Sequence, residues 1–485
     1  MRVWVRGAVV FAMLAASAFA VKVPLIGKSD PVKARLGHAY RFERGGWVYV
    51  HLEGKPEDIG FQHGYLLAPE IEDGFKAVQL SDVHASKHDW EFFRHVARDI
   101  LWPKVDPEYQ AELRGIQEGL AAQGSKLTLD DVVALNGMEE IADYYVPWLN
   151  RLQGKLNPPG LVAPGNCSAF VATGSYTSDG KIVIAHNNWT SYMVGERWRI
   201  MYDIVPAKGQ HILMDGYPGT ITSGDDFGMN DEGLVITETT ISGFVGFDPN
   251  GKPEFSRSRK AMQYAKNIDQ WIAIMSDGNN GAYANDWLLA ERKTNEIARV
   301  ELGLLHSAVD RTKDGYFFGS NFPIDVALIH DETNFDPMDA SSSPNARRKR
   351  WQQVMETNKG KIDVDLARSF MSDHEDAFEN KKGANLHTLC GHGDTNPNAE
   401  KVWELQPYDP MGAVNGKVAD AEMTKKMSMY ARTGHPCGDN FKAAPFLKEH
   451  PEYSWQAPAL HDMIAGPWTL FKERDREDNK KQDGE

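Results

Sequence analysis

Cys167 is the residue in this sequence whose type and position best fit covalent catalysis. It follows the helix-breaking runs Asn157-Pro158-Pro159-Gly160 and Pro164-Gly165-Asn166 and precedes a β-favouring run from Ser168 to Thr173. If the bond between Asn166 and Cys167 is cut, one residue carries both a thiol and a free α-amino group. An α-amine titrates at roughly 7.7 to 8.0 and a thiol near about 8.5, so the amine can accept the thiol proton near neutral pH. The pattern predicts a nucleophile that carries its own base.

The first twenty residues predict that the protein is exported. Arg2 and Arg6 precede an apolar run from Ala8 to Phe19, which closes in the small-residue pattern Ser17-Ala18-Phe19-Ala20. This is the pattern of a secretory signal peptide at residues 1–20, and the apolar run is shorter than a membrane span requires. We therefore expect a secreted or otherwise extracytoplasmic protein, in a periplasmic or lysosome-like compartment.

The cysteine count bears on which thiol stays free. Three cysteines occur, and an odd number in an oxidising compartment leaves one without an intramolecular partner. Cys390 and Cys437 both lie in the last quarter of the chain, so we expect a disulfide between them. Cys167 is then the spare thiol.

A metal site is the alternative use of this region. The side-chain types of His387, Cys390, His392 and Asp394 suit zinc. Their spacing is loose and lacks a second anchored pair, so we expect the disulfide and no metal. No Gly-rich phosphate loop follows a strand, and we expect no cofactor. The formal net charge of -15 argues against a nucleic-acid partner.

The periodicity of apolar residues divides the chain into a helical part and a strand-rich part. Helical spacing runs from Pro56 to about Asp143. Beyond Cys167 the sequence predicts strands at Ser168–Thr173, Lys181–His186, Arg197–Val205, Gly233–Ile241, Trp287–Glu291, Ile297–Leu302 and Tyr316–Ser320, with helices at Arg257–Met275 and Arg347–Met355. Strands in runs and helices in runs indicate an α+β fold of stacked layers. We expect a mainly helical segment at 21–166, a catalytic chain at 167–471 and a disordered charged tail at 472–485.

Several blocks downstream of Cys167 resemble those of the phospholipase B-like family, in the order of that family. They are His186-Asn187-Asn188-Trp189-Thr190-Ser191-Tyr192, Gly216-Tyr217-Pro218-Gly219-Thr220-Ile221, Asp225-Asp226-Phe227, Gly233 to Ile241, Asn280-Gly281-Ala282-Tyr283 with Asn285-Asp286-Trp287, and Ala431-Arg432-Thr433-Gly434 with Ala444-Pro445-Phe446. Two further segments, Ser372-Asp373-His374-Glu375 and Leu389-Cys390-Gly391-His392, resemble the acyl-coenzyme A:6-aminopenicillanic acid acyltransferase family. Both families belong to the N-terminal nucleophile hydrolase superfamily. The resemblance implies a four-layer αββα sandwich with two stacked antiparallel sheets.

The resemblance also implies the roles of individual residues. Cys167 is the nucleophile and, after self-cleavage between Asn166 and Cys167, the new N-terminus of a chain that stays associated with its partner fragment. Thr240 lies where related amidohydrolases place a group near the oxyanion, and Asn321 resembles their second oxyanion donor. The remaining residues are His186, which polarises or orients, Asn188 and Trp189, which shape the substrate pocket, and Arg347, which lies near the nucleophile in competition with Arg348.

The substrate class follows from the resemblance alone. It implies hydrolysis of an acyl ester or amide bond in a lipid-like substrate, with transient contact at a membrane surface. One alternative is N-acyl amide hydrolysis or acyl transfer to an amine. Another is a lipid-binding protein without turnover, because related bile-salt amidases carry an arginine and an aspartate on the strand beside the nucleophile, where this chain has His186 and Asn188. Asp225 and Asp226 resemble an acid/base pair, but neighbours in a strand face opposite ways and a structural role is the default.

Overall fold

The structure is a computed structural model that describes residues 31–158, 167–224 and 227–477 of the chain. The predicted signal peptide at 1–20, the residue Asn166, and the pair Asp225 and Asp226 lie outside these ranges. No helix in the described ranges is long and apolar enough to cross a membrane.

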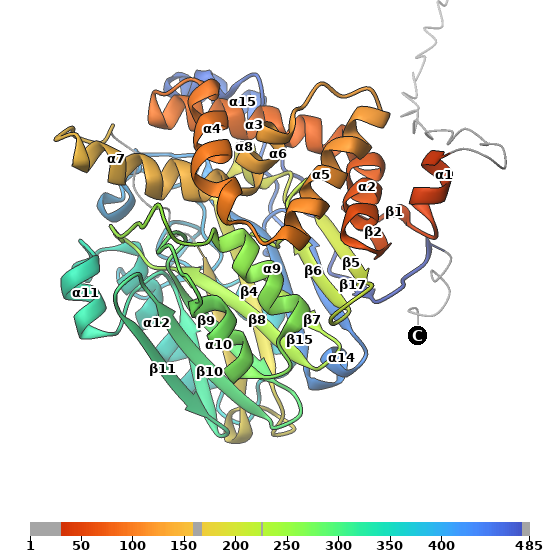
Figure 1. Cartoon of the computed structure of the whole chain (residues 1–485). Helices are drawn as coiled ribbons and strands as arrows, with labels where there is room; N and C mark the ends of the chain where they lie inside the picture. The colour runs from red at the N-terminus through yellow and green to blue at the C-terminus, as the bar shows by residue number, and fades with distance from the viewer. Residues whose placement is uncertain (1–30, 159–166, 225–226, 478–485) are drawn as a thin grey trace, which may run out of the picture.

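Two β-sheets form the centre of the molecule (Figure 1). Within the described residues, the larger sheet has nine strands in the order β1-β2-β5-β6-β7-β8-β9-β10-β11. These strands are β1 (Tyr40–Arg44), β2 (Trp47–Gly54), β5 (Ile200–Pro206), β6 (Ile212–Gly216), β7 (Gly228–Asn230), β8 (Leu234–Thr240), β9 (Asn285–Glu291), β10 (Glu296–Leu302) and β11 (Ser307–Thr312). Neighbouring strands are antiparallel, except for the parallel pair β2 and β5.

The smaller sheet has six described strands in the order β12-β3-β4-β15-β16-β17, antiparallel throughout. They are β3 (Ser168–Thr173), β4 (Val183–Ser191), β12 (Gly315–Gly319), β15 (Met411–Asp420), β16 (Ser428–Thr433) and β17 (Thr469–Lys472). A separate short pair joins β13 (Glu375–Asp376) to β14 (Lys381–Lys382).

Helices occupy both sides of the paired sheets. Those before Cys167 are α1 (Pro31–Leu36), α2 (Pro56–Leu66), α3 (Ala68–Ser86), α4 (Trp90–Val96), α5 (Pro107–Ala122), α6 (Leu129–Asn136) and α7 (Val146–Leu152), with the π-helical turns η1 (Ala97–Leu101) and η3 (Glu140–Tyr145) and the 3-10 turn η2 (Trp102–Lys104). Those after it are α8 (Tyr192–Gly195), α9 (Glu254–Tyr264), α10 (Ile268–Ser276), α11 (Val326–Glu332), α12 (Ser343–Thr357), α13 (Val364–Met371), α14 (Ala421–Lys425) and α15 (Ala443–Glu449), with the 3-10 turns η4 (Gly174–Tyr176), η5 (Lys401–Trp403) and η6 (Pro451–Gln456).

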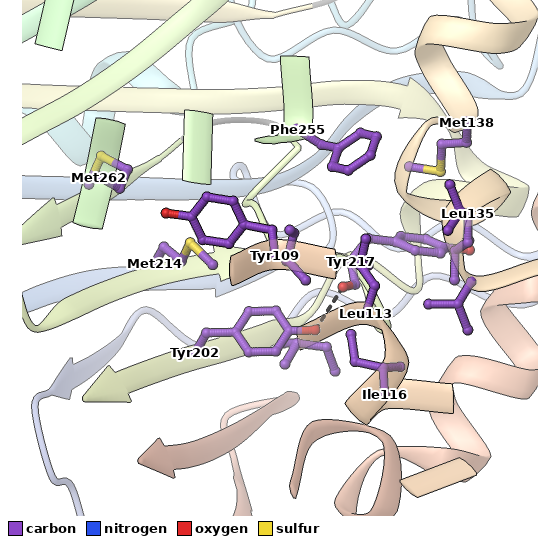
Figure 2. Close-up of a cluster of buried hydrophobic side chains, with 14 of the residues drawn as sticks. Tyr109, Leu113, Ile116, Leu135, Met138, Tyr202, Met214, Tyr217, Phe255 and Met262 are labelled. Carbon is purple, nitrogen blue, oxygen red and sulfur yellow. Dashed lines mark hydrogen bonds between the residues drawn. The ribbon is translucent and has the colours of Figure 1, made fainter. Parts of the chain in front are cut away.

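One hydrophobic core lies between the nine-stranded sheet and the helices α2 to α6, α9 and α10. Figure 2 shows part of this core, in which the α5 residues Leu113 and Ile116 lie near Tyr202 of β5. The Tyr202 hydroxyl donates a hydrogen bond of 2.8 Å to the carbonyl oxygen of Tyr217. Its polar end is therefore satisfied inside an apolar layer, as a buried tyrosine requires.

Two further cores complete the layers. Alternate residues of β3 point to opposite sides of the smaller sheet, as a pleated strand requires: Ala169 and Val171 pack against the larger sheet, and Phe170 packs against Trp351 of α12 and Phe370 of α13. The order is helices, nine-stranded sheet, six-stranded sheet, helices. This is the predicted α+β fold, a four-layer αββα sandwich, and the prediction is confirmed.

The helical segment before Cys167 contains two strands that its helical periodicity does not reveal. β1 and β2 belong to the larger sheet, and β2 pairs in parallel with β5, from Val48 opposite Ile200 to Gly54 opposite Pro206. The segments on either side of the 166/167 bond therefore share one sheet.

The disordered tail was expected to begin at residue 472, but residues 472–477 are part of the folded protein. Lys472 ends β17, and the carboxylate of Asp475 is buried at 1% exposure and lies 2.7 Å from the guanidinium of Arg44. The expectation is wrong for this part of the tail, because Lys472 belongs to β17, Glu473 pairs with His211, and Asp475 pairs with Arg44 of β1. Residues 478–485 lie outside the described ranges.

A buried ion pair joins the two sheets. The Nζ atom of Lys417, on β15, lies 2.9 Å from an Oδ atom of Asp215, on β6, and both side chains have 0% exposure. Nζ also donates to the Oδ1 atom of Asn415 at 2.7 Å. Charges this far from water are tolerated only where partners compensate for the lost hydration.

We predict that Lys417→Met destabilises the protein by about 3 to 5 kcal/mol, because it leaves a buried carboxylate without its cation. The double variant Lys417→Met with Asp215→Leu removes both charges and should recover most of that loss. Urea unfolding followed by fluorescence measures both. A double variant as unstable as the single one would show that the ion pair does not explain the effect.

Candidate active site

Cys167 lies directly before β3, with its side chain buried at 3% exposure. The residues that follow pair with both neighbouring strands, Ser168 with Asn187 of β4 and Ala169 with Gly319 of β12. By strand alternation the thiol is on the side of Ala169, which faces the larger sheet. The candidate nucleophile is thus fixed between the two sheets.

A buried carboxylate lies opposite the thiol. The Sγ atom of Cys167 is 3.7 Å from an Oε atom of Glu238, on β8 of the larger sheet. The same oxygen accepts a 3.0 Å hydrogen bond from the Tyr283 hydroxyl, and the other accepts one of 3.5 Å from Thr240. Glu238 can therefore orient the thiol and accept its proton. Sequence reasoning assigned no role to Glu238 or Tyr283; the available signal is an acidic residue inside the otherwise apolar and β-branched run of β8.

Asn321 holds the backbone nitrogen of Cys167. Its Oδ1 atom accepts a 2.9 Å hydrogen bond from that nitrogen, and its Nδ2 atom donates one of 2.9 Å to the carbonyl of Thr240. In the uncut chain the nitrogen is a peptide N–H, which stands in for the α-amine that cleavage would release. Asn321 has a φ of 70°, a left-handed conformation that asparagine tolerates better than most residues. The Nδ2 atom carries a second hydrogen, which is the one that would donate to an oxyanion. The oxyanion role of Asn321 stays a prediction.

Arg347 forms hydrogen bonds to several residues around the nucleophile. Its guanidinium is fully buried and donates to the carbonyl of Cys167, to Ser168 Oγ at 3.0 Å, to Ser320 O at 3.2 Å, to Asn321 Oδ1 at 2.8 Å and to Ser343 Oγ at 3.0 Å. All five N–H donors of an arginine side chain therefore have an acceptor.

Burial lowers the pKa of Arg347 to about 9, while the neighbouring Cys167 and Glu400 oppose this shift. The competing candidate, Arg348, instead places its guanidinium 4.5 Å from the ring centroid of Phe322. The arginine beside the nucleophile is therefore Arg347.

His186 contributes a neutral imidazole. Its ring lies on β4 at 0% exposure, and one ligand-type atom each of His186, Cys167 and Glu238 lie within 4.8 Å of one another. Burial, with a smaller contribution from Lys417, lowers the pKa of His186 well below its ordinary value. Neither ring nitrogen has a hydrogen-bond partner in the described part of the chain. His186 is thus a buried, neutral side chain next to the thiol and the Glu238 carboxylate, and its predicted polarising or orienting role stays a prediction.

A cavity of about 30 Å³ borders the thiol, and its lining includes the predicted pocket residues Asn188 and Trp189, the predicted oxyanion residue Thr240, and Cys167 and Tyr283. The indole of Trp189 packs on Arg347, whose guanidinium carbon lies 4.2 Å from the ring centroid. The structure thus brings Cys167, His186, Asn188, Trp189, Thr240, Asn321 and Arg347 to one place.

The predicted disulfide is wrong: Cys390 and Cys437 are both free thiols in the structure. The two sulfurs do lie near each other, but the ring of His392 contacts both. Counting cysteines alone missed the histidines that share this space. His387, the other candidate ligand, lies instead beside Asp376, with 3.2 Å between the imidazole nitrogen and the carboxylate.

The stacked sheets, with a nucleophile candidate at the head of a central strand, define a fold of the N-terminal nucleophile hydrolase class. The chain is similar to the phospholipase B-like proteins, as its sequence blocks predicted: the family model described as Phospholipase B matches residues 82–306.

The chain is also similar to individual phospholipase B-like proteins. The chain is 23% identical over 428 residues to phospholipase B-like 1 of Bos taurus, covering 77% of this chain and 75% of the relative. It is 22% identical over 473 residues to phospholipase B-like protein C of Dictyostelium discoideum, covering 85% and 80%. A phospholipase B-like 2 protein of Mus musculus is 25% identical over 354 residues, but the match covers only 57% of its length.

Among solved structures, a conjugated bile acid hydrolase of Clostridium perfringens matches 55% of this chain and 89% of its own, at 14% identity and a TM-score of 0.33.

We predict that Asn321→Ala lowers turnover by about 10²- to 10³-fold, the usual cost of one lost hydrogen-bonding group at a polarised centre. Asn321→Gly also lacks the amide but suits the left-handed backbone, so it separates lost chemistry from backbone strain. Steady-state kinetics of both variants, with circular dichroism as a check on folding, measures the effect. Full activity in Asn321→Gly would remove the amide from the mechanism.

Proposed function

We propose that this protein is a self-processing cysteine hydrolase that cleaves acyl ester or amide bonds in lipid-like substrates. The observation that carries the proposal is the arrangement around Cys167, whose nitrogen is bound by Asn321 and whose sulfur lies 3.7 Å from Glu238. The names of the phospholipase B-like relatives support an acyl bond as the target. Export through the N-terminal segment is part of the same proposal.

Self-processing would begin at the bond between Asn166 and Cys167. Glu238 accepts the thiol proton, and the thiolate attacks the carbonyl carbon of Asn166. The C–N bond breaks, the nitrogen of Cys167 leaves as an amine after gaining a proton, and a thioester forms. Water then hydrolyses the thioester, which gives a carboxylate on Asn166 and restores the thiol. The net reaction consumes one water and releases the α-amine.

Turnover would use the released amine as the base. Asn321 Oδ1 holds the amine in place, and Arg347 fixes the carbonyl of the same residue, so the amine stays next to its own thiol. The thiolate attacks the acyl carbonyl, the leaving group takes the proton from the amine, and water cleaves the acyl-enzyme. Arg347 and Trp189 form a fixed wall of the site.

The small cavity supports processing before turnover. A volume of about 30 Å³ is close to the share of one water molecule in the liquid, whereas pockets for organic ligands hold about 300 to 1,000 Å³. An acyl chain therefore needs a rearrangement of the uncut chain before it can reach Cys167. In this mechanism, cleavage of the 166/167 bond causes that rearrangement.

The two fragments should remain together after cleavage. β1 and β2 come from the N-terminal segment and pair with β5 of the catalytic segment within one sheet. Residues of α2 to α6 also share a hydrophobic core with that sheet. Separation would expose both the sheet edge and this core to water.

We predict that Cys167→Ala yields an uncut, folded and inactive chain, because it removes the attacking sulfur. Cys167→Ser keeps a weaker nucleophile and should process slowly. Intact mass and N-terminal sequencing of purified protein measure the outcome, with fragments expected at Val21–Asn166 and Cys167–Glu485 for the wild type. Equal cutting of Cys167→Ala at this bond would assign the cleavage to an outside protease.

We predict that the processed protein releases fatty acid from a phospholipid or a lysophospholipid and forms a covalent acyl adduct on Cys167. Product analysis with these lipids and with an N-acyl amino acid compares ester and amide bonds directly, and mass spectrometry detects the adduct. Cleavage of the amide alone would replace the lipase proposal with an amidase. A processed protein with no adduct and no product would instead be a binding protein.

A further inference from the structure

Four side chains of metal-ligand type meet near Trp189, which packs in one cluster with Cys390 and Cys437. They are His374, Cys390, His392 and Cys437, and one ligand atom of each lies within 4.8 Å of all the others. Two sulfurs and two imidazole nitrogens are a common ligand set of structural zinc sites. We propose that these residues bind one Zn²⁺ ion in a closed, four-coordinate site. This inference does not depend on the hydrolase proposal.

The spacing of the ligands fits a tetrahedron. The Nε2 atom of His392 lies 3.6 Å from the sulfur of Cys390 and 3.5 Å from that of Cys437. Bonds of about 2.3 Å from zinc to sulfur and about 2.0 Å from zinc to nitrogen give an edge of roughly 3.5 Å between such atoms at the tetrahedral angle. Both measured distances match this edge, and the remaining pairs of ligand atoms lie within 4.8 Å of each other.

His374 completes the set. Its Nε2 atom is buried, and within the described residues it has no hydrogen-bond partner. Its ring meets that of His392 edge to face, with 5.0 Å between the centroids. A buried imidazole nitrogen without a partner is costly, and coordination to the ion would satisfy it.

The surroundings resemble the outer shell of a metal site. The Nδ1 atom of His392 faces an oxygen of Asp394 at 4.0 Å, and that carboxylate accepts a 2.7 Å hydrogen bond from Tyr192. The backbone N–H of Asp439 points at the sulfur of Cys437 from 3.5 Å. A carboxylate behind a ligating histidine fixes the ring and raises its basicity. His435 stacks on His392 at 3.9 Å between centroids and closes the other side.

The ligands come from three separate parts of the chain. His374 follows α13, Cys390 and His392 belong to the loop before β15, and Cys437 follows β16. An ion at this point would therefore cross-link segments that are far apart in the sequence. Gly391, between two ligands, contacts the ring of Trp189 so closely that any side chain there would collide with it. The site thus supports the tryptophan that borders the cavity of Cys167.

The test is the metal content of the full-length protein, purified without a polyhistidine tag or chelator and measured by inductively coupled plasma mass spectrometry. We expect about one zinc per chain, and at least a tenfold loss in Cys390→Ser, Cys437→Ser and His374→Asn. His387→Asn is the matched control, because His387 lies in the same loop but outside the group of four. Cys167→Ser is a second control, and both should keep their zinc.

Wild-type protein supplies a second measurement in case the variants fail to fold. Bound zinc should protect Cys390 and Cys437 from alkylation by iodoacetamide until a chelator is added, as read by peptide mass spectrometry under native conditions. Protection that ends with the chelator, together with one zinc per chain, supports the site. A Cys390–Cys437 disulfide in the non-reduced peptide map, metal-free protein, or zinc retained by the Cys390→Ser variant would overturn it.

Discussion

The buried guanidinium of Arg347 is the constraint on which the arrangement of the site depends. A charged group without contact to water is stable only if its donors are satisfied, and here the acceptors come from the head of β3, the end of β12 and α12 itself. The same five bonds fix the carbonyl of Cys167 and the amide of Asn321. The hydrogen bonds that stabilise this buried cation therefore also fix the position of the nucleophile.

The sandwich explains why the thiol and its carboxylate come from different sheets. Cys167 is at the start of a strand in the smaller sheet, and Glu238 is within a strand of the larger sheet. Packed sheets hold facing side chains at a nearly constant distance, so the pair needs no loop to align it. The buried ion pair between Lys417 and Asp215 is a second contact that joins the two sheets.

The sequence predicted the layers well, because alternating and helical periods are local properties. β3 begins and ends at the predicted residues, β10 begins one residue before the predicted strand, and the single predicted helix at 257–275 divides into α9 and α10. Contacts between distant residues were harder to predict. Arg347 and Asn321 were predicted through family blocks. Glu238 was given no role, because an acidic residue within a strand does not show which side chains it will face in the fold. The cysteines near His392 were misread, since pairing depends on which histidines fold into the same space.

The parallel pairing of β2 with β5 affects how long a processed molecule would last. In one chain, bringing residues 48–54 to residues 200–206 costs only the entropy of closing a loop, which grows slowly with loop length. After a cut between these strands, unfolding would release two molecules, and refolding would require them to meet at a rate set by concentration. The lifetime of the processed protein would then depend on the height of its unfolding barrier. The covalent link between the two segments would assist only the first folding, which precedes cleavage.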